Sequence, residues 1–283
     1  MKKVIFRTIF IIALVAFVGA VGYIVYTYIG YKKDAKVYDE AISEFVTVNE
    51  NAGDSATGGA AGSLADGLTG GSGENKAGKD NINPFDSISD GSGDFGGLEV
   101  DFDALTKLNP DIIGWIYCPD TVINYPVLKT DNNDYYLHRN YKKEYAASGS
   151  IFVECANSDG FVDSNTIIYG HHMKDGSMFA SLSKWFKQEY YDEHPYMYLY
   201  TPDGNYRVEL FSAYTTAVGS DSYYAILTPC KELDEYLERV KNKSQFDCNI
   251  ELNSEDKYIM LSTCAYVFEN ARSVLHGKLV PIK

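Results

Sequence analysis

From Leu98 onward, apolar and polar positions follow a pattern typical of short β-strands. Runs rich in Val, Ile, Leu, Tyr and Phe alternate with turn signals such as Pro202-Asp203-Gly204. Eight runs stand out, at residues 114–118, 124–128, 150–154, 165–170, 196–201, 206–214, 257–264 and 272–282. So many short strands within one domain predict a closed barrel or a sandwich, in a mainly β fold.

Two stretches of the same region have a helical pattern instead. Residues 102–109 form a short amphipathic helix that ends before Pro110, because proline disfavours helical backbone at the preceding residue. Residues 228–243 form a second helix, with Thr228 expected as its N-cap and Pro229 as its first residue. Its apolar residues recur at helical spacing: Leu233, Tyr236, Leu237 and Val240.

The N-terminal part differs, because residues 8–30 are almost continuously apolar. A helix of this length crosses about 30 Å of hydrocarbon. The alternative is a cleaved signal peptide, but residues 16–20 offer only a poor cleavage site. We therefore expect a retained anchor at 8–31 after a cytoplasmic tail at 1–7. Positive charges are nearly balanced across the span, so this orientation depends on the shortness of the tail.

Residues 32–97 are predicted to be an extracellular linker. From about residue 49 this segment is rich in Gly, Ser, Ala and Asp. It has too few large apolar groups to offset the entropy of ordering, so it is expected to be a largely disordered stalk that provides reach. The folded domain then extends over residues 98–283.

Composition narrows the functional classes. The chain has 24 Tyr, which fits a β-rich domain, and a formal charge of −14. Such an acidic balance argues against nucleic acid as a partner, since phosphate binding needs clustered Lys and Arg. Five cysteines are widely spaced, with no CxxC pair and no Cys/His cluster, so neither a metal site nor a cofactor is predicted.

The apolar run that ends at Cys264 suggests a nucleophile held at a strand end. Arg272 begins the next run. If the two runs form an antiparallel hairpin, Cys264 and Arg272 face each other across its mouth. A guanidinium placed there could stabilise the negative oxygen that forms when a carbonyl is attacked. The alternative is that Arg272 is an ordinary surface residue of the strand.

His171 follows another apolar run through Gly170 and is also expected at a strand end. Imidazole titrates near neutral pH, which suits both removal and return of a proton. His172 competes for this role, and a histidine beside a turn is often only a polar surface residue. Cys230 is the main rival thiol, because helix N-termini activate cysteines. The other cysteines and histidines have no catalytic context: Cys118, Cys155, Cys248, His138, His194 and His276.

Several motifs resemble the sortases of Gram-positive bacteria. These are Tyr-Gly-His-His-Met-Lys-Asp-Gly-Ser-Met-Phe at 169–179 and Leu-Ser-Thr-Cys at 261–264, followed by Arg272. Residues 109–116, 123–127 and 131–138, with the helix at 228–243, are similar to class B. The motifs occur in the order of the family, over residues 102–283.

The resemblance implies an eight-stranded sortase-type β-barrel with added helices, held outside the cell membrane by a single N-terminal anchor. It also implies a cysteine transpeptidase that recognises a sorting signal near the C-terminus of secreted proteins. Such an enzyme cleaves after Thr, holds the acyl group as a thioester, and transfers it to an amine of cell-wall peptide or of a pilin.

Carried onto this chain, the resemblance implies Cys264 as nucleophile, His171 rather than His172 as acid/base, and Arg272 as the stabilising cation. It also implies four residues lining the signal-peptide groove: Asn133, Leu137, Tyr169 and Ser262. Two other functions remain open at this point. The chain could be a cysteine endopeptidase that mainly hydrolyses, or a surface-binding barrel without catalysis.

Overall fold

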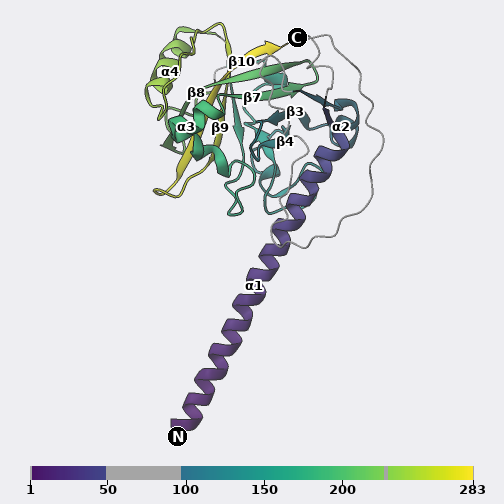
Figure 1. The fold of residues 1–283 in the computed structure, drawn as a ribbon, viewed down its shortest axis with the longest axis vertical. Helices are drawn as coiled ribbons and strands as arrows, with labels where there is room; N and C mark the ends of the chain where they lie inside the picture. Colours follow the sequence, from purple (N-terminus) through teal and green to yellow (C-terminus); the bar gives the residue numbers. More distant parts are fainter. Residues whose placement is uncertain (1, 49–96, 226–228, 283) are drawn as a thin grey trace, which may run out of the picture.

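Eight strands close into a barrel in the computed structural model, which describes residues 2–48, 97–225 and 229–282 (Figure 1). They are β3 (Ile112–Tyr117), β4 (Asn124–Leu128), β5 (Ile151–Val153), β6 (Asn165–Tyr169), β7 (Tyr196–Thr201), β8 (Gly204–Ala217), β9 (Lys257–Cys264) and β10 (Ala271–Ile282). Their order around the barrel is β10-β8-β7-β3-β4-β5-β6-β9. The β4–β5 and β6–β9 pairs are parallel and the other pairs are antiparallel. These strands confirm the eight runs and the barrel predicted from the sequence.

Helices and 3₁₀ turns cover the barrel. They are α2 (Phe102–Leu108), α3 (Gln188–Glu193), α4 (Lys231–Asn242) and the 3₁₀ helices η2 (Tyr135–His138), η3 (Asp159–Phe161) and η4 (Ala180–Phe186). Helix α2 is capped by Asp101, whose carboxylate accepts from the Ala104 N–H, and it ends before Pro110 as predicted.

Helix α4 buries the four apolar residues that the helical spacing predicted, and they pack against side chains of β6, β8, β9 and β10. Its predicted start is wrong. Cys230 has extended backbone (φ −160°, ψ 167°) and is the N-cap, so Pro229 lies before the helix, and Thr228 lies outside the described residues. Glu232 and Asp234 in the first turn favour this start, because acidic side chains stabilise a helix N-terminus.

Helix α1 (Lys2–Phe45) is continuous from the apolar segment to the barrel (Figure 1). It is long and apolar enough to cross a membrane, with an 18-residue window of mean hydropathy 2.6 that is not buried. Its last turns pack on the barrel, where Tyr38, Ala41 and Phe45 are buried. The first part of the predicted linker is therefore helical and docked.

A two-stranded ribbon follows the end of α1. Strand β1 (Val46–Val48) pairs antiparallel with β2 (Leu98–Val100), and Val48 lies opposite Leu98. The predicted stalk, residues 49–96, lies outside the described residues. Because Val48 and Leu98 are paired, α1 and the ribbon set the distance between the apolar segment and the barrel. The sequence pattern did not predict this pairing.

Candidate active site

Cys264 and Arg272 lie opposite each other where β9 and β10 meet. The antiparallel register pairs Arg272 with Cys264, as the predicted hairpin requires. Both side chains are half-buried, so the sheet holds them while they stay accessible. Nη1 of Arg272 donates to the Ala271 carbonyl oxygen (3.0 Å), which orients a guanidinium that keeps further N–H donors for a ligand.

His171 reaches the same place from the other side of β9. Strand β6 runs parallel to β9 with Tyr169 beside Ser262, and the Gly170 N–H donates to the Ser262 carbonyl (3.1 Å). The pairing of the two strands ends at Tyr169 and Ser262, two residues before His171 and Cys264 respectively. A Cβ on Gly170 would collide with the ring of Phe179, so glycine allows the close packing before His171. Cys264 and Arg272 are therefore paired across two strands, and His171 follows the end of the strand on the other side of β9.

The two adjacent histidines have different hydrogen bonds. Nε2 of His171 lies 2.7 Å from the carbonyl oxygen of Leu137. A carbonyl only accepts, so Nε2 carries a proton and Nδ1 is the nitrogen left free in the neutral ring. Nδ1 of His172 donates to the backbone carbonyl of Cys264 (2.9 Å), and its ring meets Tyr266 edge-on. His172 therefore supports the backbone at the strand end.

The predicted groove residues Asn133 and Tyr169 converge on a carboxylate that sequence reasoning missed. Glu154 follows β5 and accepts from Nδ2 of Asn133 and from the hydroxyl of Tyr169, both at 2.8 Å. Burial alone would raise the pKa of Glu154, but the hydrogen bonds from Asn133 and Tyr169 outweigh it and the pKa is lowered. Burial and the bond to Glu154 both raise the pKa of Tyr169. Glu154 is thus a half-buried, ionised anchor for both side chains.

Ser262, another predicted groove residue, is held by Tyr223. Their hydroxyl groups lie 2.6 Å apart, and the ring of Tyr223 stacks on that of Tyr169 (centroids 6.5 Å apart). Burial raises the pKa of Tyr223, partly offset by the bond to Ser262 and by the charge of Arg272. Tyr223 lies in a loop without a motif, and no sequence signal marked it. For Glu154, the available signal was its position directly after a buried strand.

Three of the other four thiols lie in settings that do not suit a nucleophile, whereas Cys230, at the N-terminus of α4, stays the rival thiol. Burial raises the pKa of Cys118 to about 12. The Cys155 thiol donates to Glu154 (3.2 Å), and this bond, with burial, raises its pKa. Cys248 donates to the Phe211 carbonyl (3.5 Å), and Cys230 caps α4. All five cysteines are free thiols, and Cys264 is the one that is paired with an arginine in the strand register and has its backbone carbonyl bonded to a histidine, His172.

Comparison with known proteins agrees with this arrangement. The model of the sortase domain family matches residues 116–280. Sortase B of Listeria monocytogenes is 44% identical over 180 residues, which cover 62% of this chain and 72% of that protein. Sortase B of Staphylococcus aureus is 33% identical over 183 residues, covering 64% and 75%.

Solved structures agree as well. A Staphylococcus aureus sortase B–substrate complex superposes with a TM-score of 0.61 at 32% identity, covering 64% of this chain and 85% of that one. Clostridium perfringens sortase B gives a TM-score of 0.60 at 34% identity, covering 64% and 100%. With its barrel and its converging strand ends, this chain belongs to the sortase family of cysteine transpeptidases and is related to sortase B.

Proposed function

We propose that the chain cleaves a C-terminal sorting signal after Thr and transfers the new carboxyl end to an amine of the cell wall or of a pilin. The observation that supports this proposal is the register of β9 and β10, which pairs Arg272 with Cys264, together with the parallel pairing of β6 and β9, which ends two residues before His171 and Cys264. Family membership supports the class of reaction, since sortases are cysteine transpeptidases.

The roles follow from the chemistry of the three groups. The thiolate of Cys264 attacks the carbonyl carbon of Thr, and Arg272 stabilises the oxygen that becomes negative. The C–N bond then breaks as protonated His171 donates its proton to the departing amine, leaving a thioester. An incoming amine attacks the thioester, His171 takes its proton, and the C–S bond breaks to release the thiolate.

The groove proposed for the signal peptide is formed by Asn133, Leu137, Tyr169 and Ser262. Hydrogen bonds already orient three of these side chains before a peptide arrives, through Glu154 for Asn133 and Tyr169 and through Tyr223 for Ser262. Such preorganisation lowers the entropy lost on binding. The proposed setting is extracellular, with α1 as a single membrane anchor and secreted proteins as substrates. A structural relative solved as a sortase B–substrate complex supports a peptide site in this fold.

A thiol-reactive analogue of a sorting peptide tests the assignment. The full chain in detergent is labelled and the adduct is mapped by mass spectrometry. We expect the adduct on Cys264, full labelling of Cys230→Ala, and no labelling of Cys264→Ala. An adduct on Cys230 would refute the assignment. Adding an amine acceptor to an uncleaved peptide should give ligated product, whereas hydrolysed peptide alone would favour an endopeptidase.

A further inference from the structure

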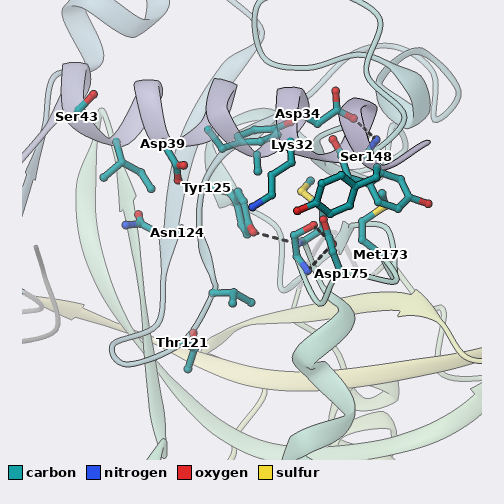
Figure 2. A pocket seen from close by; sticks show the side chains of 18 of the residues that line it. Lys32, Asp34, Asp39, Ser43, Thr121, Asn124, Tyr125, Ser148, Met173 and Asp175 are labelled. Atoms are coloured by element: carbon teal, nitrogen blue, oxygen red, sulfur yellow. Dashed lines mark hydrogen bonds between the residues drawn. The ribbon is translucent and has the colours of Figure 1, made fainter. Parts of the chain in front are cut away.

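Helix α1 contacts the barrel through two polar side chains directed at one short segment. The carboxylate of Asp34 accepts from the Ser148 N–H at 3.0 Å (Figure 2). The hydroxyl of Tyr38, a residue only 5% exposed, donates to the carbonyl oxygen of Gly149. One turn of α1 therefore holds residues 148–149 from one side.

These contacts stand beside an open space. A cavity of about 920 Å³ lies between α1 and the barrel, with walls that include Tyr31, Lys32 and Asp39 of α1 and Asn124 and Asp175 of the barrel (Figure 2). Beside this cavity, the hydrogen bonds of Asp34 and Tyr38 add to the buried apolar contacts of α1 in fixing the helix there.

The held segment packs directly on the residue that binds the catalytic imidazole. Gly149 has a left-handed backbone (φ +57°), and a Cβ there would collide with the carbonyl oxygens of Tyr136 and Leu137. The Ser150 N–H donates to the Tyr136 carbonyl (3.0 Å). The Leu137 carbonyl is the acceptor for Nε2 of His171 (2.7 Å). Residues 148–150 therefore set the position of the carbonyl that orients His171.

A second chain of contacts begins at the same tyrosine. The ring of Tyr38 meets that of Tyr125 edge-on, with centroids 5.3 Å apart. The Tyr125 hydroxyl accepts from the Met178 N–H (3.0 Å). Met178 forms a β-bridge with His172, and the next residue, Phe179, donates its N–H to the His171 carbonyl (3.0 Å). Tyr38 is thus linked to both the side chain and the backbone of His171.

We infer that Tyr38 and Asp34 of the anchor helix are positioning residues for His171. This inference rests on the proposed catalytic role of His171. The docked helix fixes the Leu137 carbonyl, which in turn selects the Nε2–H tautomer and the ring orientation needed for proton transfer. Undocking the helix leaves the thiol and the groove residues Asn133, Tyr169 and Ser262 in place but lets the imidazole leave its productive geometry, which lowers kcat more than it raises KM.

The test uses full-length protein in lipid nanodiscs, with Tyr38→Phe, Asp34→Ala and Asp34→Asn. Transpeptidation of a sorting-signal peptide gives kcat and KM, and ¹⁵N spectra of histidine-labelled, peptide-free protein give the tautomer of His171. Loss of one hydrogen bond in Tyr38→Phe is expected to lower kcat about fivefold, with KM almost unchanged and a smaller Nε2–H fraction. Asp34→Ala should also lower kcat and the Nε2–H fraction of His171. Asp34→Asn should keep both values near those of the wild type, since an amide oxygen can still accept a hydrogen bond from the Ser148 N–H.

Glu40→Gln is the matched control, because it removes the charge of α1 that pairs with Lys142 (3.3 Å) without touching residues 148–150. It should behave as the wild type. The inference is overturned if Tyr38→Phe keeps wild-type kcat and tautomer, if Asp34→Asn is as impaired as Asp34→Ala, or if Glu40→Gln loses as much. If the wild type lacks transpeptidation, the proposed function fails, while the tautomer comparison still decides the linkage.

Discussion

His172 donates from Nδ1 to the backbone carbonyl of Cys264, at 2.9 Å. The histidine next to the proposed acid/base therefore supports the main chain that carries the proposed nucleophile. Adjacent histidines with such different bonding should have separable effects when each is replaced.

His171→Ala removes the proposed proton donor and acceptor, so we expect kcat/KM to fall about a thousandfold. His172→Ala removes one hydrogen bond to a backbone carbonyl and should cost about threefold to tenfold. Single-turnover assays of thioester formation would measure both. A larger loss in His172→Ala than in His171→Ala would reverse the assignment.

Arg272→Lys keeps the positive charge but loses the planar fork of donors. Because Arg272 shares a rung with Cys264, we expect kcat/KM to fall about a hundredfold, as on removal of an oxyanion donor. Lys278→Met, on the same strand but paired with Asp256, is the control and should stay within about twofold of the wild type. Equal losses in the two variants would contradict a role for Arg272 in the reaction.

Glu154→Gln keeps one oxygen acceptor and loses the charge that holds Asn133 and Tyr169. We expect weaker binding of the sorting peptide, about tenfold in KM, with kcat little changed. The pKa of Glu154 is lowered, so wild-type binding should persist as pH falls through the usual carboxylate range and weaken only below it. The exposed Glu189→Gln is the control. A loss in kcat with an unchanged KM would contradict a role for Glu154 in binding the sorting peptide.

His276 is buried, and burial, aided by the charge of Lys243, lowers its pKa to about 3. The unfolded chain binds this proton near pH 6.5, whereas the folded chain does not. Unfolding free energy should therefore fall as pH drops from 6.5 toward 3, by about 1.4 kcal/mol per pH unit from this residue. Denaturant titrations should show a flatter pH dependence for His276→Gln. An unchanged slope would mean that His276 is protonated in the folded state.

Much of the barrel could be predicted from local patterns. Strands such as β4 and β9 are buried along most of their length, so apolar runs bounded by turns locate them. The buried face of α4 follows from helical spacing, but its start does not. The Thr228-Pro229 pair is a local signal that predicts a helix start, but Cys230 after it has extended backbone, and the helix begins at Lys231. The β1–β2 ribbon was missed because its strands have three residues each and lie far apart in the chain.

The site was predictable only in part, for a related reason. Placing Cys264 opposite Arg272 needs only a hairpin between consecutive strands, which sequence reasoning can propose. Placing His171 near them needs the parallel pairing of β6 with β9, which no local pattern encodes; the family resemblance supplied the role of His171 but not this pairing. Neither a hairpin between consecutive strands nor the family resemblance pointed to Glu154 or Tyr223. Their partners Asn133 and Ser262 come from other elements of the fold.

The unbroken path of α1 into the barrel constrains how substrates arrive. A tether of flexible chain would let the catalytic centre sample many heights and tilts above the lipid. A helix docked from Asp34, only three residues beyond the predicted span, leaves one height and a narrow range of orientations. For a chain anchored through α1, the catalytic centre would meet substrate mainly by diffusion in two dimensions along the membrane. Proteins that are themselves still held in the same bilayer would meet the thiol far more often than proteins free in the surrounding fluid.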